Sequence, residues 1–209
     1  MHDRHPTLTG NLVRLEPLQL QHLDALLAAA DTDDPELYRW TIVPRDHAGM
    51  TSYIEKALGA REAGTAVPFA TRRVSDGKVV GCTRFFDLER WDWPVGHARH
   101  DGPHPDVGEI GYTWLSPGAL RTGINTEAKL LMLGYGFETL GMARVCLQTH
   151  SRNARSRAAI ERIGGRFEGI IRASKLAPDH TPRDSARFSL LATEWPAAKE
   201  NLNRMLRRA

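Results

Sequence analysis

Residues 109–133, EIGYTWLSPGALRTGINTEAKLLML, form the stretch of this sequence that decides its fold. Aromatic, β-branched and other apolar residues dominate positions 107–115 and predict a strand there, which the turn formers after Leu115 end. Leucine-rich residues 124–140 predict a helix that begins after a turn and ends before Gly141. The chain therefore runs from a strand through a short turn directly into a long helix, an arrangement typical of α/β domains.

The sequence on both sides of this stretch supplies the other elements of an α/β domain. Strands are predicted at 11–16, 66–74, 78–86, 143–149, 166–175 and 185–193, and helices at 19–30, 48–62, 154–163 and 196–207. Ser75-Asp76-Gly77, between two of these strands, is a strong hairpin signal. Strands separated by helices in the middle, with hairpins at both ends, predict a mixed sheet in one domain over residues 1–209, with its core at about 8–196.

Composition and charge narrow the class of protein. The 209 residues are 41% hydrophobic and 25% charged, which is typical of a globular chain. No apolar run approaches the ~20 residues of a membrane span, and the N-terminus lacks the apolar region of a signal peptide. The net charge of +3 includes no dense Lys/Arg block, so neither nucleic acid nor a membrane is an expected partner. Cys82 and Cys146 lie in apolar runs and are expected to be buried thiols of a cytoplasmic protein.

The turn between the strand and the helix has the chemistry of a phosphate site. The first N–H groups of a helix are unpaired and carry partial positive charge, which suits a pyrophosphate. Gly123 allows a close approach, Arg121 adds charge, and the hydroxyls of Thr122 and Thr126 add donors. Asn125 or Thr126 is the expected N-cap. The turn is neither a Walker loop nor a dinucleotide fingerprint, and a strand–helix turn that binds nothing is the alternative.

Four segments resemble the GNAT acetyltransferases, and within them the RimJ/RimL-like branch. They are the strand at 109–115, the turn and helix RTGINTEAKLL at 121–131, the strand ARVCLQT at 143–149, and SRNARSRAAIERIGGRFEGIIR at 151–172. The resemblance covers about residues 8–196. It implies a single-domain α/β GNAT fold with a mixed, mostly antiparallel central sheet of about seven strands and helices on both faces.

The same resemblance implies acetyl-CoA as a cosubstrate and no metal. In this family acetyl-CoA lies where the fourth and fifth strands splay apart, which assigns Trp114, Leu115 and Ser116 to the pantetheine. By the same resemblance, the pyrophosphate is bound by Arg121, Thr122, Gly123, Ile124, Asn125 and Thr126. Asn153 forms a hydrogen bond with the pantetheine, and Ser156 lies near the thiol. The loop departs from the family pattern, because Leu120 replaces a polar residue and Asn125 a small one. Ile160 stands where many members carry a tyrosine as general acid.

Acetylation of an amine needs the neutral amine, so a general base assists at neutral pH. Glu109, on the strand where the sheet is expected to open, is the candidate base, and partial burial would raise its pKa. A structural carboxylate is the alternative. A backbone N–H near Trp114 or Leu115 could stabilise the oxyanion. Ser156 or solvent could protonate the leaving thiolate, although Ser156 also fits an ordinary residue of a helix N-terminus.

Aromatic residues mark the expected acceptor side. Tyr38 and Trp40 follow the first helix, in a region that often lines the acceptor site in this family. Trp91 and Trp93 lie in a long loop at 87–106 and could form an aromatic wall. Tyr38 and Trp40 could equally be core residues. Trp91 and Trp93 could equally pack onto the domain or against a second subunit, and the loop makes a homodimer an option. The loop also holds His97, His100 and His104, which lack a clear fourth ligand, so no metal site is expected.

These observations predict an acyltransferase that moves an acetyl group from acetyl-CoA to a primary amine by direct attack. The acceptor is a small molecule or a protein N-terminus. Two alternatives stay open. The same fold could use another donor such as succinyl-CoA, which extra cationic groups near the acyl end would favour. The chain could instead be a non-catalytic protein that binds acyl-CoA or a partner.

Overall fold

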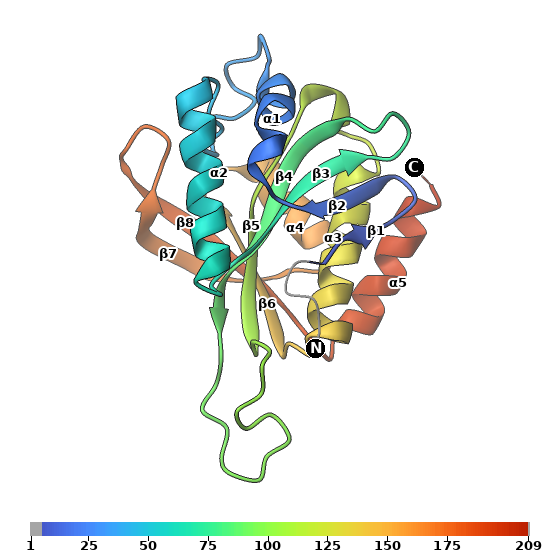
Figure 1. Ribbon diagram of the computed structural model, residues 1–209. Coiled ribbons are helices and arrows are strands. Elements are labelled where there is room, and N and C mark those ends of the chain that lie inside the picture. Colours follow the sequence, from blue (N-terminus) through green and yellow to red (C-terminus); the bar gives the residue numbers. More distant parts are fainter. Residues whose placement is uncertain (1–5, 209) are drawn as a thin grey trace.

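The computed structural model describes residues 6–208 as one α/β domain on an eight-stranded sheet (Figure 1). The strands lie in the order β1-β2-β3-β4-β5-β6-β8-β7, and of the neighbouring pairs only β5 and β6 run parallel. Their bounds are β1 Leu8–Thr9, β2 Val13–Pro17, β3 Val67–Arg73, β4 Val79–Glu89, β5 Val107–Leu115, β6 Arg144–His150, β7 Arg166–Leu176 and β8 Pro182–Leu191. The predicted mixed, mostly antiparallel sheet is therefore confirmed, with the short β1 as the additional strand.

Helices cover both faces of the sheet, as predicted (Figure 1). Their bounds are α1 Leu23–Ala30, α2 His47–Glu62, α3 Ile124–Gly134, α4 Ala154–Arg162 and α5 Trp195–Leu206. A 3₁₀ turn at Leu20–His22 precedes α1, and the helix predicted at 124–140 changes at Tyr135–Thr139 into a π-helical turn. Within residues 6–208 no helix is long and apolar enough to cross a membrane.

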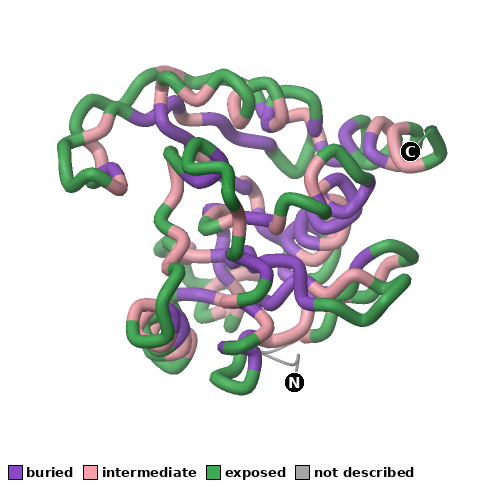
Figure 2. The backbone as a smooth tube through the Cα atoms, turned by 90° about the horizontal axis from the view of Figure 1, so that it is seen from above, coloured by how far each residue is buried: buried purple, intermediate pink, exposed green. Residues whose placement is uncertain are grey.

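Two apolar cores lie on opposite faces of the sheet. Trp114 and Leu115 are neighbours on β5, where successive side chains point to opposite faces, and each belongs to a different core. Helices α1 and α2 cover the Trp114 side, and Met50 and Ile54 form part of the buried stripe of α2. Helices α3, α4 and α5 cover the Leu115 side. Buried residues are concentrated in the central strands (Figure 2). Burying one side chain the size of Met50 stabilises the fold by about 1.5–3 kcal/mol.

Glu127 on α3 fixes the start of the sheet. Its carboxylate accepts hydrogen bonds from the backbone N–H groups of Asn11, Leu12 and Val13, at 2.9, 2.7 and 2.8 Å. The residue is 5% exposed, so these donors replace water around a buried charge. A Cβ at Gly10 would lie 2.4 Å from the Glu127 carboxyl carbon, so only glycine allows this close approach. The β1–β2 turn is thereby held against the first turns of α3.

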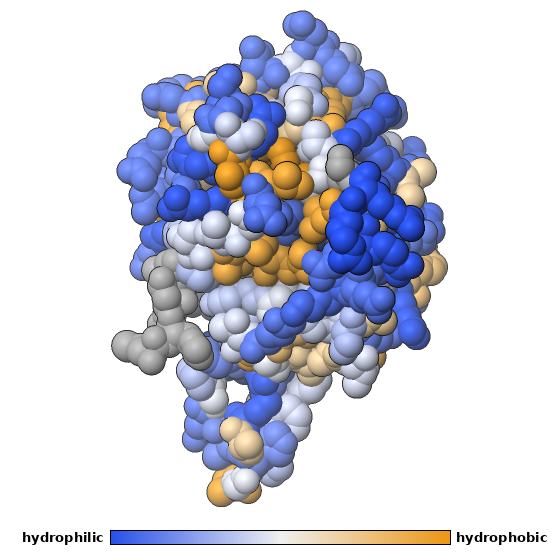
Figure 3. Space-filling model, turned by 90° about the vertical axis from the view of Figure 1, so that its right-hand side faces the viewer, coloured by the Kyte–Doolittle hydropathy of each residue, from blue (hydrophilic) through white to orange (hydrophobic). Residues whose placement is uncertain are grey.

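The segment between β4 and β5 projects from the body as an arm, residues 90–106 (Figures 1 and 3). The arm is shorter than the loop predicted at 87–106 because β4 continues to Glu89. The carboxylate of Asp106, a buried residue, accepts hydrogen bonds from the Trp91 N–H and the Trp93 indole N–H, both at 2.8 Å. The Arg99 guanidinium pairs with the same carboxylate at 2.7 Å. One buried carboxylate therefore organises the base of the arm.

Candidate active site

The parallel strands β5 and β6 pair over only part of their length. Their register runs from the start of both strands to Ile110 and Leu147, and there it stops. Beyond this point β5 stays paired with β4 as far as Leu115, and β6 stays paired with β8 as far as His150. The two strands splay apart and leave facing backbone edges without a partner strand. An extended ligand can bind such edges in the manner of an added strand.

A β-bulge marks the point of separation on β5. The register with β4 shifts before Arg84, and Tyr112 has a left-handed backbone with a φ of 51°. This conformation costs a non-glycine residue about 1–2 kcal/mol, and bulges are frequent beside active sites, where they re-aim side chains. The Tyr112 ring is exposed, and the guanidinium carbon of Arg84 lies 3.9 Å from its centroid. The bulge thus places an aromatic ring and a buried cation beside the splay.

Glu109 lies on β5 directly before the strands separate. Its side chain is buried, and Nε2 of Gln148 on β6 donates a 2.8 Å hydrogen bond to Oε2. Nζ of Lys175 lies 3.7 Å from Oε1. Burial raises the pKa of Glu109, while the positive charge of Lys175 lowers it to a smaller extent. A carboxylate with a raised pKa is better suited to proton transfer near neutral pH than an exposed one.

A pocket of about 230 Å³ opens beside Glu109. Its lining comprises Asp87, Glu89, Val107, Gly108, Glu109, Cys146, Gln148 and Arg187. Three carboxylates stand against one guanidinium in this lining. The Lys175 ammonium, which lies 3.7 Å from Glu109 and 3.9 Å from Asp87, offsets a second carboxylate, so the carboxylates outnumber the nearby cations by one and favour a cation only weakly.

The N-terminus of α3 is open. Gly123 occupies the N-cap position and has no side chain to cap the helix, so the predicted cap by Asn125 or Thr126 is wrong. The hydroxyl of Thr122 accepts a 3.3 Å hydrogen bond from the first helical N–H, that of Ile124. Oδ1 of Asn125 is buried and has no hydrogen-bond partner within residues 6–208. A buried acceptor in this state is costly unless water or a ligand supplies a donor. The uncapped turn fits the pyrophosphate of the expected acetyl-CoA, and the Asn125 acceptor fits one of its amide N–H donors.

The other residues expected at the pyrophosphate differ in what they offer. Arg121 is exposed and has a left-handed φ of 58°. Thr122 uses its hydroxyl inside the turn, where it donates to the carbonyl of Ala119 at 2.7 Å. The side chains of Ile124 and Thr126 are buried. Arg121 is therefore the side chain best placed to meet a phosphate. The other residues can contribute backbone N–H groups, except Ile124, whose N–H already donates to the Thr122 hydroxyl.

The residues expected along the pantetheine offer their backbone rather than their side chains. The side chains of Trp114 and Leu115 are buried in the two cores. The N–H of Ser116 donates to the carbonyl of Val80 on β4 at 2.7 Å, so the Ser116 N–H faces away from the splay. Alternation along the strand then turns the N–H and carbonyl of Leu115 toward the splay.

Tyr38 and Trp40 lie at the mouth of the splay. The Tyr38 hydroxyl donates to the carbonyl of Leu115 at 3.0 Å, and burial raises the pKa of Tyr38 to about 12, which keeps the phenol protonated. The Trp40 ring packs on His150 at the end of β6, with centroids 4.3 Å apart. The segment between α1 and α2 thus contacts the ends of both separated strands.

Asn153 and Ser156 lie at the start of α4, just after the end of β6. Asn153 is the N-cap of this helix, and its Oδ1 accepts a 3.0 Å hydrogen bond from the N–H of Ser156. This bond uses neither the amide NH₂ of Asn153 nor the hydroxyl of Ser156. Both groups therefore keep hydrogen-bonding capacity beside the second strand of the splay.

Trp91 and Trp93 lie at the opposite end of β5 from Tyr38 and Trp40. The nine residues of β5 separate the arm from the mouth of the splay, a distance of about 25–30 Å at ~3.3 Å per residue. The ring of Trp93 stacks on His97 with centroids 4.1 Å apart. The four aromatic residues expected at the acceptor side therefore form two separate groups. Residues 6–208 contain no cluster of three or more His, Cys, Asp or Glu side chains that could hold a metal.

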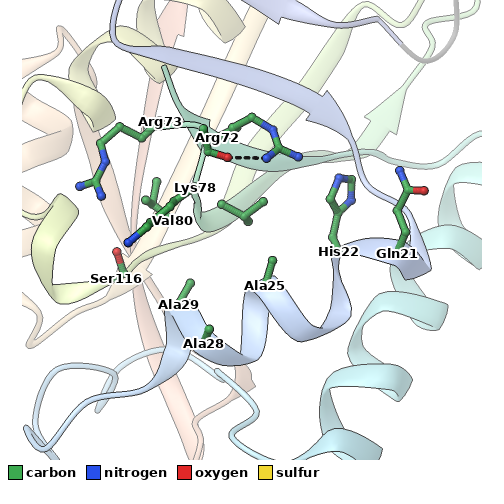
Figure 4. Close-up of a pocket in the computed structure, with 12 residues that line it drawn as sticks. Gln21, His22, Ala25, Ala28, Ala29, Arg72, Arg73, Lys78, Val80 and Ser116 are labelled. Atoms are coloured by element: carbon green, nitrogen blue, oxygen red, sulfur yellow. Dashed lines mark hydrogen bonds between the residues drawn. The ribbon is translucent and has the colours of Figure 1, made fainter. Parts of the chain in front are cut away.

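A larger pocket of about 590 Å³ lies between α1 and the β3–β4 hairpin (Figure 4). Ala25, Ala28 and Ala29 supply its helical side, where their small side chains leave space. Lys78 and Ser116 lie across from them (Figure 4). This pocket is on the β4 side of β5, whereas the splay is on the β6 side, so the two hollows are distinct.

Sequence reasoning missed the residues that surround Glu109. Gln148 offered a signal, since it is an amide side chain inside an otherwise apolar central strand. The predicted loop at 87–106 includes Asp87, whereas the structure places Asp87 within β4. Lys175 offered no signal, because it belongs to the edge strand β7 and two other strands lie between β7 and β5. Its contact with Glu109 depends on how the far hairpin curves over the sheet.

Known proteins share this architecture. The family model described as Acetyltransferase (GNAT) domain matches residues 13–166. YdaF of Bacillus subtilis (strain 168) is 37% identical to this chain over 91 residues. The aligned region covers 44% of this chain and 49% of YdaF, which is named provisionally as a ribosomal N-acetyltransferase. The match thus spans about half the length of that relative.

Solved structures match over nearly the whole chain. A GCN5-related N-acetyltransferase from Brucella melitensis is 32% identical, with a TM-score of 0.82 over 97% of this chain and 86% of that one. RimJ of Mycobacterium smegmatis in complex with CoA-disulfide is 23% identical and shares the fold, with a TM-score of 0.78 over 98% of this chain and 97% of RimJ. The chain belongs to the GNAT acetyltransferase family.

Proposed function

We propose that this chain is an N-acetyltransferase that moves the acetyl group of acetyl-CoA to a primary amine. The observation that carries the proposal is the separation of β5 and β6 beyond Ile110 and Leu147, beside the uncapped N-terminus of α3. An unpaired strand edge suits an extended pantetheine, and an open helix N-terminus suits a pyrophosphate. RimJ of M. smegmatis, which has the same fold, is known in complex with CoA-disulfide, and this supports the choice of cosubstrate.

The cosubstrate would be held mostly by backbone groups. The edge of β5 at Leu115 would pair with the pantetheine through its N–H, because the Leu115 carbonyl already accepts from Tyr38. Asn153 would add a side-chain hydrogen bond. The N–H groups at the start of α3 would bind the pyrophosphate, with Arg121 supplying a neutralising charge. Asn125 would accept a hydrogen bond from the ligand.

Glu109 would act as the general base. Acetyl-CoA supplies an activated thioester when bound. Glu109 takes a proton from the acceptor ammonium, directly or through water, and the neutral amine attacks the thioester carbonyl. A C–N bond forms and the C–S bond breaks, while a backbone N–H of β5 just beyond Ile110, where the strands separate, stabilises the oxyanion. The nitrogen loses its second proton to solvent. The leaving thiolate takes up a proton from solvent or from Ser156, which solvent then reprotonates.

The acceptor would be an amine on a small molecule or at a peptide N-terminus. The carboxylates of the pocket beside Glu109 favour the cationic form of such an amine during binding. Trp40, which packs on His150, would line the mouth of the splay, while the buried Tyr38 would hold the Leu115 carbonyl.

Trp91 and Trp93, on the arm, would contact only an acceptor long enough to extend along the sheet. YdaF is named provisionally as a ribosomal N-acetyltransferase, and a protein acceptor would be long enough.

A dicarboxylic donor such as succinyl-CoA is the second candidate. The observation that favours it is the presence of Arg84 close to Tyr112, with the half-buried Arg183 near enough for its charge to interact with Glu109 and Tyr112. Guanidinium groups at this place could pair with the free carboxylate of a succinyl group. A direct comparison of the two donors decides between them.

The cellular setting and assembly are also part of the proposal. Cys82 and Cys146 are free and buried, which fits a protein of the reducing cytoplasm. The exposed apolar end of the arm fits a contact between two copies (Figure 3). Sedimentation velocity tests whether the protein forms a dimer. If the dimer peak disappears in a variant with residues 94–98 shortened, the dimer interface lies on the arm.

Two measurements test the proposed function. Titration calorimetry with acetyl-CoA, succinyl-CoA and free CoA measures donor binding, and bound ligand raises the melting temperature through linkage. Release of CoA is then followed with a panel of amines that includes polyamines, amino acids and short peptides with defined N-termini. We expect acetyl-CoA to bind and at least one amine class to accelerate CoA release. Binding without turnover on any amine would leave a binding protein, and absence of acyl-CoA binding would overturn the proposal.

A further inference from the structure

The side chain of Lys175 lies where an acceptor amine would have to lie. Its Nζ is 3.7 Å from Oε1 of Glu109 and 3.9 Å from Oδ2 of Asp87. The same ammonium is 4.6 Å from the centre of the Phe86 ring, within cation–π range. Two carboxylates and one aromatic face therefore surround it. The side chain is still 36% exposed, so solvent and a ligand can reach it.

The backbone around Lys175 directs it to this place. The register between β7 and β8 shifts between Ile171 and Lys175, and Ala173 has a left-handed φ of 47°. The N–H of Ala173 donates to the Asp184 carboxylate at 2.9 Å, which holds the irregularity in place. Bulges of this kind bend a strand and re-aim its side chains. Lys175 thereby reaches Glu109 from the edge strand of the sheet, across β8 and β6.

We propose that Lys175 is a self-acetylation site of this protein. The inference rests on the proposed function, because it uses the same donor and the same base. Lys175 is the lysine that pairs with Glu109 within residues 6–208. The chain has five lysines, and the other four are Lys56, Lys78, Lys129 and Lys199. Of these, Lys129 is buried in the core and Lys199 pairs with Glu138 on another face.

The chemistry balances without any further reactant. Glu109 takes one proton from the Lys175 ammonium, and the neutral amine attacks the thioester carbonyl of acetyl-CoA. The C–N bond of N-acetyl-lysine forms as the C–S bond breaks. The leaving thiolate takes up a proton, and the second proton lost by the nitrogen passes to solvent. The products are one acetylated chain and one CoA.

Self-acetylation would change the acceptor site. The ammonium between Glu109 and Asp87 would become a neutral amide, so two carboxylates would face the pocket without their resident cation. An incoming cationic amine would then meet a more negative site with less competition. The modification would therefore lower the KM for a cationic acceptor, which makes the first turnover on Lys175 a priming step.

Mass spectrometry tests the proposal on the full chain. The protein is incubated with acetyl-CoA that carries a deuterated acetyl group, in the absence of any acceptor, and intact mass and peptide mapping follow the label. We expect one acetyl group per chain, on Lys175, and more than tenfold faster labelling there than at Lys199. The first-order rate should stay constant on tenfold dilution, because the reaction is intramolecular. Labelling that spreads over all exposed lysines, or that slows on dilution, overturns the inference.

Matched variants separate enzymatic from spontaneous acetylation. Lys175→Arg keeps the charge and removes the nucleophile, so single labelling should disappear. Glu109→Gln should slow labelling of Lys175 at least tenfold while Lys199 labels as before, and an unchanged rate overturns the inference. External amine turnover is measured in parallel. Turnover with no label on Lys175 overturns this inference alone, whereas neither label nor turnover with any amine overturns the proposed function.

Discussion

Gln148 Nε2 donates a 2.8 Å hydrogen bond to Oε2 of Glu109 at the point where β5 and β6 begin to separate. The bond orients the buried carboxylate and favours its ionised form, which desolvation disfavours. Oε1 is left to face Lys175. Glu109 therefore combines a fixed orientation with a raised pKa, and these are the two properties that a general base needs.

Glu109→Gln should lower kcat by about 10²–10⁴-fold, because general-base assistance is lost while the side chain keeps its size. Burial raises the pKa of Glu109 above its ordinary value of 4.5. A general base must be ionised to accept a proton. In the parent protein kcat/KM should therefore rise with pH through a midpoint above 4.5 and then level off. The variant should lose this acidic limb in a pH series from 4.5 to 9.

Glu161→Gln serves as the control, since Glu161 is exposed on α4. Its kcat and its pH profile should match those of the parent protein. A Glu109→Gln variant with the parent's kcat and acidic limb would exclude Glu109 as the base.

Gln148→Met should move the acidic limb of kcat/KM to higher pH. The substitution keeps the approximate side-chain volume but removes the donor to the Glu109 carboxylate, so the pKa of Glu109 rises further. The plateau at high pH should change much less than the midpoint. A pH series that shows an unchanged midpoint would mean that Gln148 only fills space.

Arg121→Gly should weaken acyl-CoA binding by about tenfold or more, because a charge-assisted hydrogen bond contributes about 1.5–3 kcal/mol. The left-handed φ of 58° at Arg121 suits glycine, so the melting temperature should not fall. Arg121→Lys keeps the charge and should lose less affinity. Calorimetry at two salt concentrations measures both variants. Equal affinity in the parent and in Arg121→Gly would remove Arg121 from the cofactor site.

The local sequence pattern was sufficient to predict the helices and strands, but not which backbone and side-chain groups face the site. The strand at 107–115 and the helix after Gly123 are visible in the sequence, because apolar periodicity and turn residues act over short distances. The role of Ser116 was not visible: its N–H is bonded to Val80 on β4, and only the register of two strands determines which edge an N–H faces. The same limit applies to Trp114, which was expected to contact the cofactor and buries its side chain in the core.

Contacts between distant segments were the hardest part to predict. Asp106 reads as a loop residue, yet its buried carboxylate organises the arm that carries Trp91 and Trp93. Lys175 reads as one charge near a hairpin, yet a bulge brings it to Glu109. Each contact follows from strand order and curvature, which depend on the packing of the whole domain rather than on neighbours in sequence.

Glu127→Ala should destabilise the fold by about 3 kcal/mol. It removes one carboxylate that accepts three backbone N–H groups, and the substitution leaves these donors partly buried without a partner. Urea unfolding followed by circular dichroism measures the change as a lower midpoint at constant slope. Glu127→Gln keeps one acceptor oxygen and should lose less stability. If the urea midpoint of Glu127→Ala equals that of the parent protein, water replaces the carboxylate as hydrogen-bond acceptor without loss of stability.

We expect the stability of the parent protein to rise between neutral and alkaline pH, and Lys129→Met should abolish this rise. Lys129 is buried, and its Nζ contacts the hydroxyls of Thr83 and Thr113 at 3.3 and 2.9 Å. Desolvation lowers its pKa from 10.5 to about 7 in the folded protein. As pH falls from 10.5 toward 7 the unfolded chain binds a proton that the folded chain does not bind, so stability decreases over this window.

Conversely, stability should increase as pH rises from 7 toward 10.5, and the gain is complete above the unfolded pKa. The methionine variant does not titrate, so its midpoint in urea should depend less on pH over this window and should equal or exceed that of the parent at pH 7. Lys56→Met is the control, because Lys56 is exposed on α2 and should leave the pH dependence unchanged. If Lys129→Met keeps the parent's slope of stability against pH, the lysine is charged in the folded state, and water or an unrecognised anion must stabilise it.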